Sequence, residues 1–302
     1  MADPREWGPV MENLRGALMM TLAMAAFAIE DALVKNLTGG MAPGQIIAVI
    51  GAGGALILAA WLKSRGIPLF LPELREPAPM IRLGFEVFGT ACYTSSLALI
   101  PLTTASAVIQ ATPLVVALGG AVFLGQAVGW RRWGAILVGL AGVLLILRPT
   151  GDSFQLATLL AFGGMMGLAG RDIATRAIGG QLSGVHLSLV AFLALIPAGI
   201  LMAVFSGQGL VVPSARDAAL LGVCVGFGLG GYLAIVAATR AGDVAFTSSF
   251  RYFRMVFAVI IGFFVFAERP DLPTLIGTAI VIGAGLFILM RERRTRRFTP
   301  GT

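Results

Sequence analysis

Ten long apolar stretches run along this chain, and short polar or charged segments separate them. Each stretch is close to or above the roughly 20 residues that a helix needs to cross a bilayer. The stretches span residues 14–37, 42–62, 79–100, 103–124, 130–147, 154–178, 185–205, 215–239, 243–268 and 272–290. The pattern therefore predicts an all-α polytopic membrane protein with ten transmembrane helices.

The composition strengthens this prediction and narrows the chemistry. Of the 302 residues, 57% are hydrophobic and only 12% are charged, whereas soluble domains carry about 25% charged residues. Cys92 and Cys224 both lie inside apolar stretches, and His186 is the single histidine. We therefore expect no disulfide framework, no metal site and no cofactor.

The basic residues lie beside the ends of the apolar stretches and predict an orientation. Most Lys and Arg residues fall on the side that holds both termini, and the last twelve residues are strongly basic. By the positive-inside rule both termini are cytoplasmic, in an inner or plasma membrane. Membrane topology thus explains the net charge of +7, and we expect contact with the lipid bilayer but not with nucleic acid. The sequence leaves the oligomeric state open, and a monomer is compatible with it.

A polar connection at residues 149–152 divides the chain into two halves. The expected organisation is a cytoplasmic segment at 1–13, a first repeat at 14–148, a second repeat at 153–290 and a cytoplasmic basic tail at 291–302. Each half holds five apolar stretches, an odd number. The second half then enters the membrane from the side opposite to the first, which predicts inverted repeats like those of many secondary transporters.

Matching residues in the two halves support the repeat. Glu30-Asp31-x-x-x-Lys35 in the first stretch corresponds to Arg171-Asp172-x-x-x-Arg176 in the sixth, an offset of 141 (172 minus 31). Tyr93 in the third stretch corresponds to Tyr232 in the eighth, an offset of 139 (232 minus 93). Gly134 and Gly142 in the fifth stretch correspond to Gly277 and Gly285 in the tenth, an offset of 143 (277 minus 134). Three matches in the same order at similar offsets favour a true repeat over chance.

Two arginines interrupt the ninth stretch, Asp243–Glu268, which otherwise reads as one uninterrupted helix. An arginine at the centre of a membrane helix costs about 2.5–3.5 kcal/mol even on insertion scales. Arg251 and Arg254 share one helix face, with Ser248 one turn before them, and Arg254 falls near mid-membrane when counted from Asp243. That face holds either buried ion pairs or a cavity that receives an anionic group, such as the carboxylate of a zwitterionic substrate.

The segments YTSSLALIPLTTASAVIQATPLVVALGGAVFL and FVFAERPDLPTLIGTAIVIGAGLFIL, together with the five-plus-five repeat, resemble the EamA-type branch of the drug/metabolite transporter superfamily. Within that branch the chain looks most like the YddG-type exporters of aromatic and other amino acids. The resemblance implies ten helices around a central cavity, and export of amino acids or related metabolites by alternating access. Gln126 departs from the acidic residue common in the family, and Arg254 stands where the first half has Pro113.

Further polar residues at membrane depth are candidates for binding or for structure. Glu86 could pair with an arginine, bind a substrate ammonium or bind a proton. The other candidates for the substrate site are Tyr93, Gln110, Tyr232, Ser248, Arg251 and Arg254. Asp31 with Lys35, and Asp172 with Arg176, have the i, i+4 spacing of helical salt bridges and suit packing or gating. Pro113 predicts a kink in the fourth helix.

Other classes of membrane protein fit the sequence less well. An embedded enzyme would need a nucleophile, a base or a metal set, and no histidine cluster or Walker loop occurs. A scaffold would not need arginines at mid-depth, and a channel would be expected to show a repeated filter sequence. A secondary transporter of a small molecule, with no catalytic residues, is the function that the sequence favours.

Overall fold

The computed structural model describes residues 4–123, 125, 129–148, 157–178, 182–207, 209–240, 247 and 249–298, and in them the chain forms helices and no β-strand. The helices are α1 (Pro4–Leu37), α2 (Pro43–Ser64), η1 (Pro72–Arg75), α3 (Pro77–Leu99), α4 (Leu102–Ile109), α5 (Thr112–Phe123), α6 (Trp130–Leu147), α7 (Thr158–Ile178), α8 (Gly184–Phe205), α9 (Ala215–Arg240), η2 (Phe250–Tyr252), α11 (Phe253–Phe266) and α12 (Leu272–Phe298). Each of the ten apolar stretches contains a helix among these residues. The 149–152 connection, Gln126, Asp243 and Ser248 lie outside the described residues.

The fourth stretch is broken where the proline predicted a kink. α4 ends at Ile109 and α5 begins at Thr112, so the break directly precedes Pro113. Pro113 has no N–H with which to bond the Ile109 carbonyl four residues back. The Thr112 hydroxyl takes over this role and donates to the Ile109 carbonyl at 2.6 Å. The predicted kink at Pro113 is confirmed.

The ninth stretch is not one continuous helix, and here the sequence prediction is wrong. Arg251 lies in the short 3-10 helix η2, and Arg254 lies in the first turn of α11. Counting helical residues from Asp243 therefore does not give the depth of Arg254. Local propensity alone could not reveal this change, because no proline or glycine marks it in the residues from Phe250 to Phe253.

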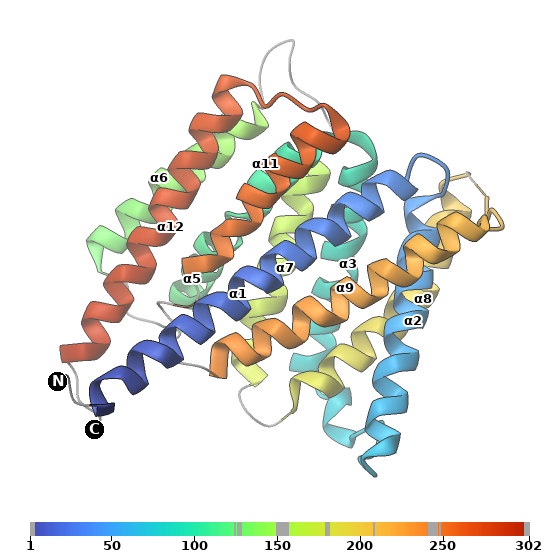
Figure 1. Ribbon diagram of the computed structural model, residues 1–302, viewed down its shortest axis with the longest axis horizontal. Coiled ribbons are helices and arrows are strands. Elements are labelled where there is room, and N and C mark those ends of the chain that lie inside the picture. Colours follow the sequence, from blue (N-terminus) through green and yellow to red (C-terminus); the bar gives the residue numbers. More distant parts are fainter. Residues whose placement is uncertain are drawn as a thin grey trace.

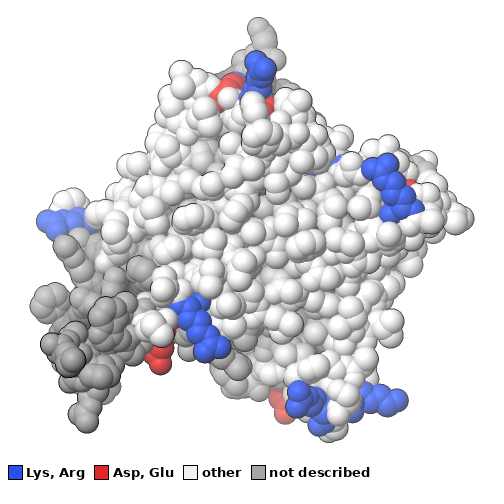
Figure 2. All heavy atoms as spheres, in the orientation of Figure 1, with Lys and Arg blue, Asp and Glu red and all other residues white. Residues whose placement is uncertain are grey.

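Six of the described helical segments are long and apolar enough to cross a membrane. They are Met11–Leu37, Pro43–Ser64, Leu102–Phe123, Gly184–Phe205, Ala215–Ile235 and Leu272–Met290. Figure 2 shows a broad face without charged side chains, and most of the visible Lys and Arg side chains lie toward its edges. Such a face suits contact with lipid, and together with the six segments it identifies the chain as an integral membrane protein.

The helices pack in pairs from opposite halves of the chain (Figure 1). α1 packs along α9, α2 along α8, α3 along α7 and α6 along α12. Glycines permit the closest approaches, because small residues let membrane helices come together at backbone distance. A Cβ on Gly167 of α7 would lie 2.4 Å from the Gly89 Cα of α3, and one on Gly44 of α2 would lie 2.4 Å from the Gly199 carbonyl of α8.

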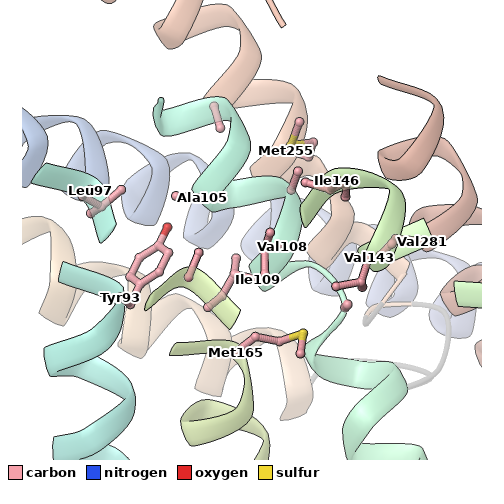
Figure 3. Close-up of a cluster of buried hydrophobic side chains, with 14 of the residues drawn as sticks. Tyr93, Leu97, Ala105, Val108, Ile109, Val143, Ile146, Met165, Met255 and Val281 are labelled. Atoms are coloured by element: carbon pink, nitrogen blue, oxygen red, sulfur yellow. The ribbon is translucent and has the colours of Figure 1, made fainter. Parts of the chain in front are cut away.

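The largest buried core lies where α3, α4, α6, α7, α11 and α12 meet (Figure 3). Val108 and Ile109 at the end of α4 are surrounded by side chains from the other helices, including Met165 and Met255. Tyr93 of α3 is also part of this core, and its hydroxyl reaches a charged group described next. The core therefore holds the broken fourth helix and the start of α11 together.

Candidate functional site

A buried ion pair joins the start of α11 to α1. Nη2 of Arg254 lies 2.7 Å from Oδ2 and 2.9 Å from Oδ1 of Asp31, and Nε lies 3.1 Å from Oδ2. The Tyr93 hydroxyl donates a further hydrogen bond to Oδ2 at 3.0 Å. The Arg254 guanidinium also lies 5.4 Å from the centre of the Phe27 ring. The charge of Arg254 is thus balanced within the protein by Asp31. This is the buried ion pair that the sequence analysis gave as one of two alternatives.

Asp31 does not pair with Lys35, contrary to the spacing prediction. Lys35 Nζ instead lies 3.8 Å from a Glu268 oxygen, and it donates to the carbonyls of Ile100 and Leu97 at 2.6 and 3.2 Å. The i, i+4 spacing permits a salt bridge but does not enforce one. Lys35 lies in the last turn of α1, where the ends of α3 and α11 offer it closer acceptors.

Glu268 binds the first turn of α4 as well as Lys35. Its carboxylate accepts from the backbone N–H groups of Leu102 and Thr103 at 2.7 and 3.0 Å, and from the Thr103 hydroxyl at 2.9 Å. Ala267 has a φ of 52°, and this left-handed residue ends α11 and directs Glu268 toward α4. We call this arrangement of Lys35, Glu268, Leu102 and Thr103 the Lys35–Glu268 latch.

A cavity of about 230 Å³ lies beside the latch. Its walls include Thr103, Glu268 and the ion pair between Arg148 and Asp271. Of the residues predicted to bind substrate, none that the structure describes lines this cavity. It therefore marks the end of the bundle next to the latch rather than the predicted substrate site.

A chain of alternating charges joins α3 to α7. Glu86 lies 3.2 Å from Arg82, one turn earlier on α3, and 3.1 Å from Arg171 on α7. Arg171 continues to Asp172 at 2.8 Å. The sequence prediction that Asp172 pairs with Arg176 is wrong, because Arg171 is the residue that binds Asp172, and Arg176 is exposed. Glu86 thus has the arginine partners that were one of its three open interpretations.

Arg251 differs from the other arginines of the bundle interior. Its guanidinium has no ion-pair or hydrogen-bond partner among the described residues, and its Nε is buried without an acceptor. Asp172 exerts the strongest attraction on this charge among the carboxylates, and the positive charges of Arg171 and Arg176 oppose it. A buried charge without a partner is costly, so a group that meets it gains binding energy.

Gln110 fixes the backbone that carries Arg251. From the break between α4 and α5, its side-chain amide donates to the carbonyls of Arg251 and Tyr252 at 3.4 and 3.2 Å. The Gln110 amide is therefore hydrogen-bonded to the backbone of η2 in this structure. Tyr232, also predicted for the site, lies on α9 with its hydroxyl against Gly184, at the end of the bundle near Arg82.

Glu30 was not among the sequence candidates, although it stands next to Asp31. It lies at membrane depth on α1, and no ion pair or hydrogen bond reaches its carboxylate from the described residues. Its side chain rests on the bare backbone of Gly228 in α9. The sequence signal was present, because a glutamate inside a membrane helix is unusual by itself.

Comparisons with known proteins place the chain among transporters. Residues 14–148 match the EamA-like transporter family. The chain is 30% identical to an S-adenosylmethionine uptake transporter of Rickettsia felis, over 68% of this chain and 69% of that protein. It is 28% identical to a riboflavin transporter of Rhizobium johnstonii, over 93% of each, and 28% identical to a pseudopaline exporter of Pseudomonas aeruginosa, over 89% and 94%.

A solved crystal structure has a similar backbone arrangement. The TM-score is 0.64 at 20% sequence identity, over 92% of this chain and 98% of that one. At this identity the likeness concerns the fold alone. It extends over both halves of the chain, including the second half, which lies beyond residues 14–148.

Proposed function

The chain belongs to the EamA-like transporter family, and from that premise we propose that it carries a small carboxylate-bearing metabolite across the plasma membrane, with Arg251 binding the carboxylate. One observation carries the assignment of the site. Arg251 is the bundle-interior arginine without an acceptor among the described residues, whereas Arg82, Arg171 and Arg254 each hold a carboxylate of the protein. The planar guanidinium suits a carboxylate, because two parallel N–H groups can meet both oxygens.

In this proposal Arg251 alone binds the substrate carboxylate, and Arg254 does not. Arg254 and Tyr93 serve as positioning residues, because both are bonded to Asp31. Gln110 holds the backbone of Arg251, and Glu86 is balanced by Arg82 and Arg171. Tyr232 stays in the proposal as a wall residue, together with Ser248, which lies outside the described residues.

Alternating access between two inverted repeats is the proposed mechanism. The observed helix pairs support it, because exchanging the two halves converts the α1–α9 pair into the α7–α3 pair, and both occur. The pairs α2–α8 and α6–α12 are each converted into themselves. The repeat also maps Lys35 onto Arg176 (35 plus 141). In this structure Lys35 pairs with Glu268 in the latch, whereas Arg176, its counterpart in the other half, is exposed. The two ends of the bundle therefore differ, as alternating access requires when one end is closed and the other is open.

Amino acids, as expected from the sequence, remain one substrate class within this proposal. The relatives widen it, because they are named for riboflavin, S-adenosylmethionine and pseudopaline. S-Adenosylmethionine is itself an amino-acid derivative with a free carboxylate, which agrees with recognition by Arg251. The relatives include both uptake and export proteins, and the amino-acid resemblance favours export.

The test is transport by the purified chain in liposomes. Radiolabelled amino acids, S-adenosylmethionine and riboflavin are offered one at a time, and flux is measured in each direction. For a transported carboxylate, Arg251→Gln removes a charge-assisted hydrogen bond, which costs about 1.5–3 kcal/mol or roughly 10–150-fold in KM. Arg216→Gln is the matched control, since Arg216 is an exposed arginine at the start of α9.

Two results would contradict the proposal at different points. If none of the compounds crosses the membrane faster than it does in protein-free liposomes, the proposal that the chain transports such metabolites is contradicted. Flux that Arg251→Gln and Arg216→Gln reduce equally would keep transport but remove Arg251 from the site. A riboflavin flux unaffected by either variant would show that the carboxylate is not what the site recognises.

A further inference from the structure

The Glu30 carboxylate, on the α1 side of the bundle, has no ion-pair or hydrogen-bond partner in the part of the chain that the structure describes. Its neighbour Asp31 takes all three close contacts from Arg254, so the nearest cation is already engaged. Glu30 stands seven residues before the end of α1, or about 10 Å along the helix axis. Ionised carboxylates at this depth are costly unless they are paired, and they mark pathways for ions or protons.

The packing around Glu30 decides which ligand fits. A Cβ placed on Gly228 would lie 2.8 Å from Oε1, 3.2 Å from Cδ and 3.3 Å from Oε2 of Glu30. The carboxylate therefore fills the space left by the missing side chain, between α1 and the backbone of α9. A substrate ammonium group would have to separate these two helices in order to reach it from that side. A proton needs no such space.

The charged and titratable groups facing Glu30 come from four helices. Asp31 lies beside it on α1, the Cys224 thiol faces it from α9, and Arg254 approaches from α11. Tyr93 of α3 completes the group through its bond to Asp31. The charged residues of α9 lie at its two ends, about 18 Å from Gly228 along the axis, so α9 brings no cation to Glu30.

We propose that Glu30 is the proton-binding site of this transporter, and that its protonation is coupled to movement of the substrate. The coupling rests on the proposed transport function. Neutral Glu30 suits its half-buried position against Gly228, because partly burying a carboxyl group without donors costs less when the group is uncharged. Ionised Glu30 is favoured by fuller hydration or a cation, which becomes available when the α1–α9 interface opens. The same step moves Asp31 and its partner Arg254, which lies three residues from Arg251 at the proposed substrate site.

Glu86, which the sequence offered as a proton site, is a weaker candidate in this structure. Arg82 and Arg171 both bind its carboxylate, and two adjacent cations stabilise the ionised form. Glu30, which has no such partners among the described residues, is therefore the better candidate for the proton site. Glu86 then serves as an internal comparison for Glu30 in the same experiments.

The first experiment detects the proton without needing a substrate. Dicyclohexylcarbodiimide reacts with protonated carboxyl groups in apolar surroundings, and its adduct is found by peptide mass spectrometry. In the full-length protein we expect labelling of Glu30 that decreases as pH rises, with little labelling of Glu86 or of Glu12, which is exposed near the start of α1. Absence of a Glu30 adduct at every pH would overturn the proton site, whatever the protein transports.

The second experiment tests coupling in the transport assay described above. A gradient of one pH unit is about a tenfold difference in proton concentration, so one proton per substrate accumulates the substrate about tenfold. We expect Glu30→Gln to keep substrate exchange at equal pH and to lose this accumulation, while Glu12→Gln keeps both. Accumulation unchanged in Glu30→Gln would overturn the coupling. Loss of both activities with intact folding would instead make Glu30 a substrate-binding residue and overturn the proton role.

Discussion

Replacing Arg254 by glutamine tests whether the Asp31–Arg254 pair holds α11 against α1. The Asp31 side chain is 7% exposed and that of Arg254 is 18% exposed, so water cannot compensate fully for the lost partner. Removing one member of a buried ion pair costs about 3–5 kcal/mol, because the other charge stays buried. Arg254→Gln should therefore lower the free energy of unfolding by an amount in this range.

The assay is thermal unfolding in detergent, followed by the fluorescence of the native tryptophans. One kcal/mol shifts Tm by about 2–4 °C in chains of 150–250 residues, and by somewhat less in this longer chain, so the expected decrease is roughly 5–15 °C. The double variant Asp31→Asn with Arg254→Gln should recover most of this loss, because no unpaired charge remains. Arg251→Gln should leave Tm unchanged or raise it, since no described residue pairs with its guanidinium.

The effects of Arg251→Gln and Arg254→Gln on Tm decide whether the ion pair stabilises the bundle. If Arg254→Gln were as mild as Arg251→Gln, the pair would not stabilise the bundle, and Arg254 would return as a candidate for the substrate. If the double variant were as unstable as Arg254→Gln alone, the loss would come from the contact of the guanidinium with the Phe27 ring rather than from the unpaired carboxylate.

Three further predictions address packing, the latch and topology. Gly167→Ala should destabilise the protein by about 1–3 kcal/mol in the same thermal assay, because its Cβ would enter the Gly89 backbone, whereas Gly84→Ala on α3 meets nothing within 4 Å and should be neutral. Glu268→Ala removes three hydrogen bonds to the start of α4 and should lower stability by roughly 1–3 kcal/mol, so an unchanged Tm would discount the latch. Single cysteines at Arg65 and Val212, without the native cysteines, should react with an impermeant thiol reagent from opposite sides of the membrane, and labelling from one side would contradict the predicted topology.

The run lengths of apolar residues determined most of the secondary structure. A helix must satisfy its own backbone hydrogen bonds in lipid, so a stretch of about 20 apolar residues has few other structures open to it. α6 begins at Trp130 and ends at Leu147, the same residues that the sequence predicts. The break before Pro113 was also predictable, because the missing N–H is a local property of the chain.

The fold around α11 was less accessible to sequence reasoning. η2 and α11 have the composition of one helix, and the 3-10 turn that carries Arg251 is held by the Gln110 amide, 141 residues away in the chain. A long-range hydrogen bond of this kind leaves no periodic signal in the segment that it shapes. The depth and direction of Arg251 and Arg254 consequently required the tertiary structure.

The sequence by itself determined that charges lie at membrane depth, and that they need partners because lipid offers none. Only the tertiary structure decided which charges are paired. The i, i+4 spacing allowed Asp31 to pair with Lys35, yet Asp31 binds Arg254, 223 residues away, and Lys35 binds Glu268. Helix packing brings distant guanidinium and carboxylate groups within 3 Å in rigid geometry, which outweighs a flexible local pair. Among the residues that the structure describes, the same packing gives Glu30 and Arg251 no partner, which is why the proposed proton and substrate sites emerge from the structure rather than from the spacing of residues.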